Sequence, residues 1–385
     1  MHRATWYWLI HNRKYALFRS ILIGAFGGSS ACVALVHWYY PSSPLWTNGR
    51  NIDDGLYSTA LGSRRIYATS AIQTFDQNSK ARTHTTSVDR FYRKNGKLPK
   101  PKRMHDSLEQ LIQNDERSSG YGTKCQKNRD AQIDKILVIG DVHGCLHELI
   151  LLVDKAVKDE NHGQPFDAII LVGDLVNKGP LSAEVVKFVR EQRGWYTVRG
   201  NHDDSALSAA LGDEKRMGQA KYEWLQNETL SDGDILWMSE LPYTITVPSF
   251  MWKHGSNMDD IDTIVVHAGL VPKMKLFDQD IVSMTTIRDV IASDDGFSYQ
   301  QFARQKIPEA QNADHPIPWT KVWNDNKGPT LIVFGHDAKR KLQFTEYAIG
   351  LDTGAVYGGK LTGCILPTKK IVNVQSKRQY CPINS

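Results

Sequence analysis

The chain has 385 residues, enough for one large domain or two modest ones with a real hydrophobic core. Hydrophobic residues make up 41% of it, which is ordinary for a globular protein and excludes disorder over the whole chain. The formal net charge of +5, concentrated toward the N-terminus, suits an anionic partner but equally describes a solvated basic surface.

The first segment in chain order predicts a membrane anchor. Residues 21–40 contain no Asp, Glu, Lys or Arg, and they match the length of about 20 residues needed to cross a bilayer. Basic residues precede this stretch, and an aromatic cluster of the membrane-interface type, Trp38 to Tyr40, ends it. The pattern predicts a cytosolic tail over 1–20 and a transmembrane signal anchor over 21–40, in the type II orientation. A cleaved signal peptide and a buried soluble helix are the alternatives.

Residues 41–132 are expected to form a flexible linker. They lack long helical or strand periodicity, and they are rich in Ser, Thr, Asn, Lys and Arg. The stretch SLEQLIQNDER, residues 107–117, is compatible with a short helix. The basic tract at 93–103 could hold a polyanion, although a solvated tether explains it as well.

From residue 133 onward, apolar strand-like runs alternate with stretches of helical spacing. Strands are expected within DKILVIGD, FDAIILVGD, WYTVRGNHDD, DTIVVHAGL, TLIVFGHD and EYAIGLDTG, and helices within LHELILLVDKAVKDE and SAEVVKFVREQ. Strands that are apolar throughout predict an α/β fold in which the sheets are covered on both faces. We place the domain at 133–375, ending in a hairpin, with a C-terminal tail at 376–385.

Five of these strands end in, or run into, the same kind of chemistry: Gly-Asp-x-His-Gly, Gly-Asp, Gly-Asn-His-Asp, His-Ala-Gly and Gly-His-Asp. Because the carboxyl ends of strands in α/β sheets gather at one edge, the side chains that follow them should converge there. Any one of these motifs alone would be a turn, a cap or a hydrogen-bonded histidine. The converging set is Asp141, His143, Asp174, Asn201, His267 and His336.

Two carboxylates, three imidazoles and an amide oxygen predict a site for two divalent metal ions. This donor set suits Zn first, with Mn, Co or Fe as alternatives. Asp174 is the natural bridge, since one carboxylate can span two cations roughly 3.5–4 Å apart. Asp141 and His143 would complete one ion, and Asn201 with the two remaining histidines would complete the other.

These motifs resemble those of the calcineurin-like metallophosphoesterases. Within that family, the stretches GDLVNKGP, RGNHDD, VVHAGLVP, MTTIRDV, FGHDAKR and GLDTGAVYGGKLT are similar to those of the ApaH-like phosphatases. With an N-terminal anchor, the chain looks most similar to the fungal vacuolar endopolyphosphatases of this group. The resemblance covers residues 133–374 and implies a four-layer αββα sandwich, here preceded by the transmembrane helix and the linker.

The resemblance also implies roles for single residues. It makes His202 the general acid, and it places Lys178, Arg199 and Arg288 at phosphate-binding positions, although Arg199 could instead brace the site through an ion pair. Asn177 stands where phosphoprotein phosphatases have an Asp that orients the catalytic imidazole and stabilises its charged form. An amide cannot supply that charge, so a leaving group that is already stable as an anion is favoured.

The function expected from sequence is therefore a two-metal phosphohydrolase that cleaves phosphoanhydride bonds by attack of a metal-bridging hydroxide. The expected substrate is inorganic polyphosphate, cleaved in a lumen, with the vacuole as the expected organelle. Dinucleoside polyphosphates or RNA caps are the first alternative, phosphoproteins the second, and a membrane-tethered scaffold with a dead site a third. The membrane is the expected partner of the N-terminal helix, and no sequence-specific binding of nucleic acid is expected.

The cysteines set a further limit. The chain has five cysteines and no Cys-x-x-Cys, which argues against a zinc finger or a dense disulfide framework. One disulfide, between Cys364 and Cys381 or involving Cys125, remains open for a lumenal domain.

Overall fold

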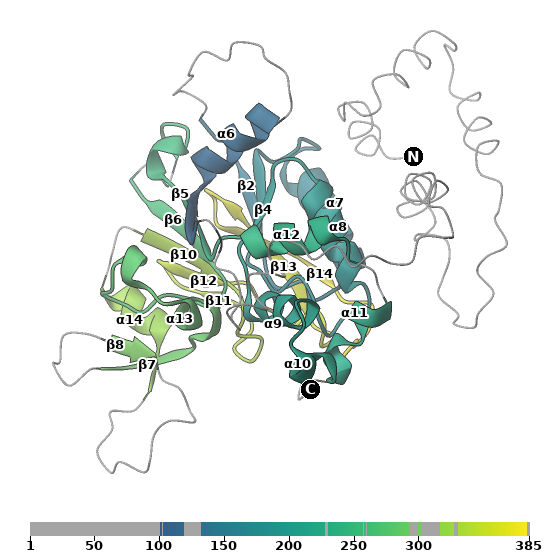
Figure 1. Ribbon diagram of the computed structural model, residues 1–385. Helices are drawn as coiled ribbons and strands as arrows, with labels where there is room; N and C mark the ends of the chain where they lie inside the picture. The colour runs from purple at the N-terminus through teal and green to yellow at the C-terminus, as the bar shows by residue number, and fades with distance from the viewer. Residues whose placement is uncertain are drawn as a thin grey trace, which may run out of the picture. The chain divides into compact units, whose positions relative to one another are not determined.

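The structure is a computed structural model that describes residues 101, 103–118, 132–227, 230–256, 258, 260–292, 299–301, 316–326 and 330–382. All of these residues belong to one compact unit, Thr85–Ser385 (Figure 1). The predicted tail, the predicted anchor and residues 41–100 of the predicted linker lie outside the described residues. Within the ranges given above, no helix is both long enough and apolar enough to span a bilayer.

One sheet has five strands in the order β14-β13-β2-β3-β4. Its parallel strands are β2 (Ile136–Ile139), β3 (Ala168–Leu171) and β4 (Trp195–Thr197). The hairpin β13 (Lys360–Leu366) and β14 (Lys370–Gln375) joins β2 in the antiparallel direction. The first three apolar runs predicted from sequence therefore share one sheet with the predicted terminal hairpin.

The second sheet has six strands in the order β1-β5-β6-β10-β12-β11. Its strands are β1 (His105–Ser107), β5 (Thr244–Val247), β6 (Asp262–Val266), β10 (Thr330–Phe334), β11 (Gln343–Phe344) and β12 (Ala348–Gly350). The central strands β6, β10 and β12 run parallel to one another, so their carboxyl ends face the same way. A small third sheet, β8-β7-β9, comprises β7 (Asp289–Ala292), β8 (Tyr299–Gln301) and β9 (Ile317–Pro318).

The two large sheets pack face to face and share one core. Alternate residues of each strand point into it; in β2, for example, Val138 belongs to the same cluster as Val265 and Leu331 of the other sheet. The side chains between them face outward. Leu137, for example, lies near Leu152 of the helix Leu146–Lys155, as their shared contact with Gly363 of β13 shows. These strands are apolar on both faces because one face packs against the other sheet and the opposite face packs against a helix.

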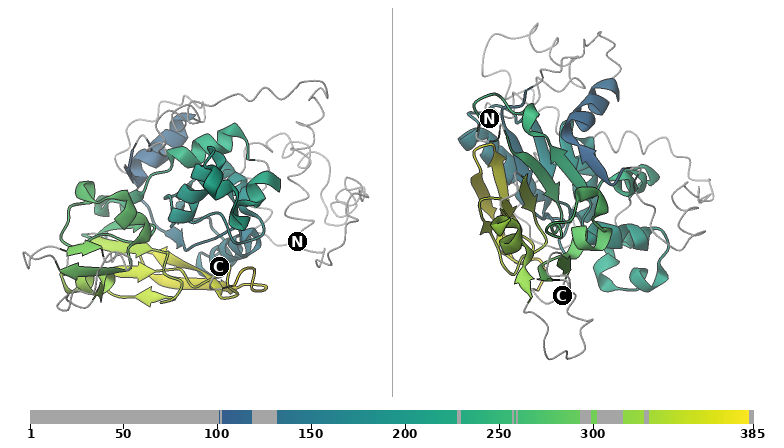
Figure 2. Two further views of the ribbon diagram at one scale, coloured as in Figure 1. Left: turned by 60° about the horizontal axis from the view of Figure 1, so that its bottom comes forward. Right: turned by 90° about the vertical axis from the view of Figure 1, so that its left-hand side faces the viewer.

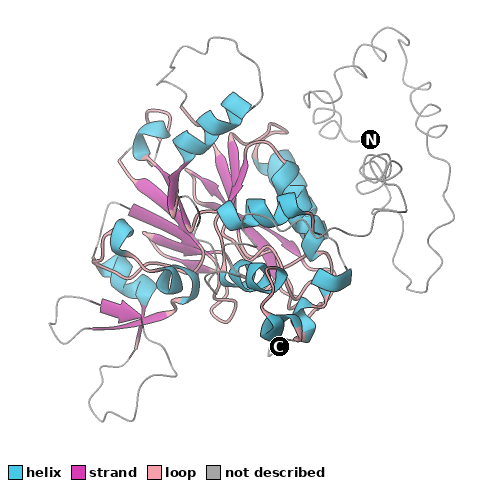
Figure 3. Ribbon diagram, viewed as in Figure 1, coloured by secondary structure: helices cyan, strands magenta, loops and turns pink. Residues whose placement is uncertain are grey.

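Helices cover the two outer faces. α7 (Leu146–Lys155) packs on β13 and β14, and α8 (Ser182–Glu191) packs on β4. On the other side, α13 (Ile281–Thr286) and α14 (Trp319–Asp325) share a cluster with the outer face of the six-stranded sheet. The order helix, sheet, sheet, helix is visible in Figures 2 and 3, and it matches the predicted four-layer αββα sandwich.

The remaining helices are short and lie between the main elements. Five of them join β4 to β5: α9 (Asn201–Ala210), α10 (Glu214–Met217), η3 (Ala220–Tyr222), α11 (Trp224–Asn227) and α12 (Asp232–Glu240). A π-helical turn, η2 (Ala156–Glu160), extends α7, and two 3₁₀ turns are η4 (Ser249–Met251) and η5 (Leu276–Asp278).

The prediction of a flexible linker over 41–132 is wrong for the described residues 103–118. β1 pairs in parallel with β5, and α6 (Leu108–Ser118) follows it directly. Leu108 is fully buried in the core between the sheets, and Asp115 accepts a hydrogen bond from the hydroxyl of Tyr196. A strand of three residues is too short to show a period of two, so only its pairing with β5 reveals it.

We expect Leu108→Ala to lower the free energy of unfolding by about 2–5 kcal/mol, because it empties a fully buried site that a linker residue would not occupy. Urea denaturation of the two proteins measures the difference. Gln113→Ala, on the exposed side of the same helix, is the matched control and should leave stability nearly unchanged. Equal stability of the Leu108 and Gln113 variants would show that α6 is not part of the folded domain.

The C-terminal boundary at 375 is also too early. The Ser376 hydroxyl donates to the Ala355 carbonyl over 2.6 Å, and the Tyr380 hydroxyl donates to Glu148 over 2.9 Å, so residues beyond 375 pack on the domain. Cys364 and Cys381 are both buried thiols, so they do not form the disulfide considered from sequence.

Candidate metal centre

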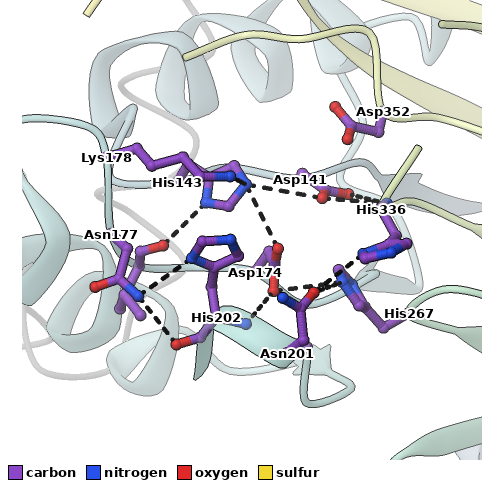
Figure 4. A network of polar contacts seen from close by, with 12 residues as sticks. Asp141, His143, Asp174, Asn177, Lys178, Asn201, His202, His267, His336 and Asp352 are labelled. Atoms are coloured by element: carbon purple, nitrogen blue, oxygen red, sulfur yellow. Dashed lines mark hydrogen bonds and ion pairs between the residues drawn. The ribbon is translucent and has the colours of Figure 1, made fainter. Parts of the chain in front are cut away.

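The strand ends converge as the sequence predicts. β2 leads to Asp141 and His143, and β3 leads to Asp174. The other four side chains follow β4, β6 and β10: Asn201, His202, His267 and His336. Figure 4 shows all seven pointing toward one another from different segments. Two triads, His143 with Asp174 and His202, and Asp141 with Asp174 and His267, each bring their ligand-type atoms within 4.8 Å of one another.

The turns that hold these side chains are strained. His143, Asp174 and His336 are not glycines, yet their φ angles are 46°, 50° and 67°, in the left-handed region. Such conformations cost of order 1–3 kcal/mol each and persist where the surrounding fold imposes them. The left-handed conformation turns each side chain toward the site shortly after its strand ends.

Two glycines make room for the carboxylates. A Cβ atom on Gly335 would lie 1.9 Å from Oδ1 of Asp141, and a Cβ atom on Gly200 would lie 2.2 Å from Oδ1 of Asp174. No side chain fits at either position without displacing the carboxylate. The glycines next to the polar residues in the sequence motifs are therefore required by the close approach of two segments.

Backbone carbonyls set the tautomers of two histidines. Nδ1 of His143 lies 3.0 Å from the Val176 carbonyl, and Nδ1 of His267 lies 2.9 Å from the Val172 carbonyl. A carbonyl only accepts, so Nδ1 carries the ring proton of each neutral imidazole. The unprotonated Nε2 atoms then face the site, and each lies 3.4 Å from an oxygen of Asp174.

This arrangement places acceptor against acceptor. Nε2 of His267 is 3.0 Å from Oδ1 of Asn201, which is also 3.0 Å from Nδ1 of His336. Burial lowers the pKa of His267 to about 4, so near neutral pH the ring does not take up a second proton that could donate to Asn201. A cation between these residues would accept the lone pairs of His143, His267, Asp174 and Asn201 together. The residues present therefore fit the divalent ions that the donor set predicts.

The carboxylates lead to the same conclusion. Burial raises the pKa of Asp174 to about 7, although the Lys178 ammonium works against the shift. Burial, followed by the charges of Asp352 and Asp174, raises the pKa of Asp141 well above its usual range. So many buried carboxylates are costly without positive charge among them, and divalent ions would supply it.

Asp352 is a site residue that the sequence reasoning missed. It follows β12, is buried, and lies close to Asp141 (Figure 4). Its signal was present, because it comes two residues after a buried strand within GLDTG, as Asp141 does within its own motif. Its Oδ1 accepts the backbone N–H of Gly354 over 3.1 Å, which fixes the turn.

His202 lies beside the predicted ligands but has different partners. Its ring packs edge to face against His143, with centroids 4.8 Å apart, and its backbone N–H donates to Asp174 over 2.9 Å. Nδ1 faces the side-chain amide of Asn177 at 3.3 Å, where phosphoprotein phosphatases are expected to have a carboxylate. Burial, followed by the charge of Lys178, lowers the pKa of His202 well below its usual range.

Of the three cations predicted to bind phosphate, the structure places two at the site. Nζ of Lys178 lies 3.2 Å from Nε2 of His143, and above the ring of Tyr357 at 5.2 Å from its centroid. Arg288 is 45% exposed and donates to the carbonyl of His336 over 3.2 Å, at the rim. Both positions suit a phosphate contact, which stays a prediction.

The prediction that Arg199 binds substrate is wrong. Its side chain is 1% exposed, and its Nε lies 2.9 Å from Asp204. Its NH2 donates to the Tyr243 hydroxyl over 2.5 Å, and its NH1 donates to the Ser239 carbonyl over 3.2 Å. Those contacts hold the guanidinium group in the interior, so Arg199 braces α9 against α12 and the segment after it. This agrees with the alternative prediction that Arg199 supports the site through an ion pair.

We expect Arg199→Ala to lower the free energy of unfolding by about 3–5 kcal/mol, because the Asp204 carboxylate loses its buried partner. In the folded fraction, KM for substrate should stay unchanged. Arg288→Ala is the matched comparison and should raise KM with little effect on urea denaturation. A raised KM without lost stability in the Arg199 variant would restore its role in binding.

A family model and several known proteins match the part of the chain that carries this site. Residues 134–340 match the family model described as Calcineurin-like phosphoesterase. The chain is 29% identical over 259 residues to a bis(5'-nucleosyl)-tetraphosphatase (asymmetrical), PrpE, of Bacillus cereus strain AH187, covering 64% of this chain and 96% of that protein. It is 27% identical, with the same coverage, to the protein of that name from Bacillus anthracis strain CDC 684 / NRRL 3495. Among solved structures, a putative diadenosine tetraphosphatase is 31% identical, with a TM-score of 0.49, over 63% of this chain and 94% of that one.

Proposed function

Because the chain belongs to the calcineurin-like phosphoesterase family, we propose that it is a metal-dependent hydrolase of phosphoanhydride bonds, with inorganic polyphosphate as its substrate. The observation that carries the proposal is the pairing of a complete set of metal-binding side chains with an amide, Asn177, against Nδ1 of His202. The first feature supports phosphoryl chemistry, and the second supports the class of leaving group.

The six predicted ligands would hold the two ions, and bound divalent cations supply nucleophilic water near neutral pH by lowering its pKa to about 7. The chain's own groups do the rest. Lys178 and Arg288 would offset the charge on the phosphoryl oxygens. The water oxygen would form the new bond to phosphorus while the bond between phosphorus and the bridging oxygen breaks. His202 would donate a hydrogen bond to that bridging oxygen as it leaves.

The amide of Asn177 restricts what His202 can do. A carboxylate at this position would accept a ring N–H and stabilise a positive imidazolium, whereas an amide N–H cannot. A serine alkoxide must be protonated to leave, but a phosphate leaves as a stable anion. The arrangement therefore favours phosphoanhydrides over phosphoserine in proteins.

A dinucleoside polyphosphate is the second candidate. The bacterial relatives named above are bis(5'-nucleosyl)-tetraphosphatases, whose named substrates contain the same phosphoanhydride bond. Tyr357 stands next to Lys178 and is partly exposed, so its ring could contact a nucleobase.

We further propose a lumenal location, in the vacuole, with residues 21–40 as the membrane anchor. The charge and aromatic pattern of the sequence supports this location.

The deciding experiment compares substrates under identical conditions. The purified chain, loaded with Zn²⁺, Mn²⁺ or Co²⁺, is assayed on long-chain polyphosphate, diadenosine tetraphosphate and a phosphoserine peptide. We expect polyphosphate to give the highest kcat/KM and the peptide the lowest. An Asn201→Ala protein purified in parallel controls for contaminating phosphatases. Faster cleavage of diadenosine tetraphosphate would select the second candidate, and turnover of the peptide equal to that of polyphosphate would overturn the proposal.

A further inference from the structure

Trp224 touches the site from a segment that the motifs do not include. It begins the short helix α11, between α9 and α12, and it is partly buried. Its indole Nε1 donates to Oδ1 of Asn177 over 2.8 Å, across 47 residues of sequence. Asn177 is fully buried and sits at a φ of 70°. Its backbone N–H donates to the hydroxyl of Ser182 over 3.0 Å, so both its main chain and its side chain are held.

The indole contact decides which way the Asn177 amide points. The two ends of an amide are distinguished only by their partners, and an indole N–H can only donate. Oδ1 must therefore face Trp224. This leaves Nδ2 facing His202, where it lies 3.1 Å from the backbone carbonyl and 3.3 Å from Nδ1 of the ring. The carbonyl contact favours the same orientation, since a carbonyl only accepts, and the indole holds the other end of the amide in place.

The amide orientation in turn decides where the His202 ring carries its proton. An N–H group that faces Nδ1 needs a lone pair there, so the proton of the neutral ring sits on Nε2. This is the reverse of His143 and His267, whose Nδ1 atoms face carbonyl oxygens. Those two rings present a lone pair to the centre, as a metal ligand must, whereas His202 presents a donor.

We propose that Trp224 is a positioning residue: through Asn177 it holds His202 in the tautomer with the proton on Nε2, which makes His202 a hydrogen-bond donor to substrate and not a metal ligand. The catalytic part of this inference rests on the proposed function, while the tautomer does not. It also explains why His202, although it lies within ligand distance of His143 and Asp174, belongs to a different chemical role.

Trp224→Phe removes the indole N–H and keeps an aromatic ring. With the Zn²⁺-loaded full chain and polyphosphate, we expect kcat to fall by about tenfold with KM unchanged, since the lost contact orients a group that acts in the transition state. Trp323→Phe is the matched control. Nε1 of Trp323 donates a hydrogen bond of 3.3 Å to the Thr330 carbonyl, and this bond is not part of the site. That variant should keep the wild-type kcat.

The tautomer is read directly by two-bond ¹H–¹⁵N spectra of the Zn²⁺-loaded full chain labelled with ¹⁵N-histidine. His202→Gln assigns the signals of this ring among the 13 histidines. We expect a protonated Nε2 and a bare Nδ1 in the wild type and in Trp323→Phe, and a mixture of tautomers in Trp224→Phe. Asn177→Asp should move the proton to Nδ1, because a carboxylate accepts it.

The outcomes separate the two claims. An unchanged His202 tautomer in Trp224→Phe, or a fall in kcat equal to that of Trp323→Phe, overturns the positioning role. If the wild type cleaves no phosphoanhydride at all, the proposed function fails, and the spectra still decide whether Trp224 fixes the tautomer.

Discussion

An Asp174→Asn variant is expected to lose about 1,000-fold or more in kcat on phosphoanhydride substrates, because bound metal supplies several kcal/mol of transition-state stabilisation. Asp174 faces both halves of the site and lies closer to His143 than Asp141 does. Its Oδ2 lies 3.4 Å from Nε2 of His143, and its Oδ1 lies 3.4 Å from Nε2 of His267. An amide presents an NH₂ group on one of these sides, and that group cannot ligate a cation.

The measurement combines steady-state kinetics with metal analysis of the purified protein. We expect the variant to hold fewer ions than the wild type, while its circular dichroism and urea midpoint show a folded domain, since asparagine keeps the shape of the side chain. Asp278→Asn, on the exposed turn η5, is the control and should match the wild type in both assays. Full activity of the Asp174 variant at wild-type metal content would exclude a bridging role.

A His202→Gln variant is expected to lose about 100-fold in kcat while it keeps its metal, since a positioned acid or donor contributes roughly 10²–10⁴-fold to such reactions. The ring lies against His143 and is oriented by Asn177, so with its proton on Nε2 it would serve as a donor and not as a metal ligand. The loss should be greater for a phosphoserine peptide than for polyphosphate, because the alkoxide depends more on the donor.

Metal analysis distinguishes this outcome from the loss of a ligand. If His202→Gln lowers metal content as Asp174→Asn does, then His202 completes the triad with His143 and Asp174 as a ligand, and its role as donor is wrong. His254→Gln, an exposed histidine between η4 and β6, controls for a general effect of the substitution and should leave kcat unchanged.

The sequence alone predicted the metal centre because its signal is local. Each ligand follows a short apolar run within a few residues, as Asp141 follows Ile136–Ile139, and the rule that parallel strands end at one edge then brings the ligands together. The same rule applies to Asp352, which follows β12 as Asp141 follows β2, so the sequence carries the signal for this residue too. Glycines such as Gly335 are visible in the sequence as part of the motifs. The sequence does not show why glycine is required there, which is that a Cβ atom would overlap the Asp141 carboxylate.

The tertiary structure decided the features that depend on contacts between distant segments. β1 is a strand only because β5 offers it hydrogen bonds across more than a hundred residues. Arg199 lies next to a catalytic motif in sequence, yet its side chain turns away to Asp204 and Tyr243. The tautomers of the histidines are set by carbonyl and amide partners that no spacing reveals. Residue types and their order determine which groups can do chemistry, but hydrogen-bond direction determines which role each one takes, and that direction exists only once the chain has folded.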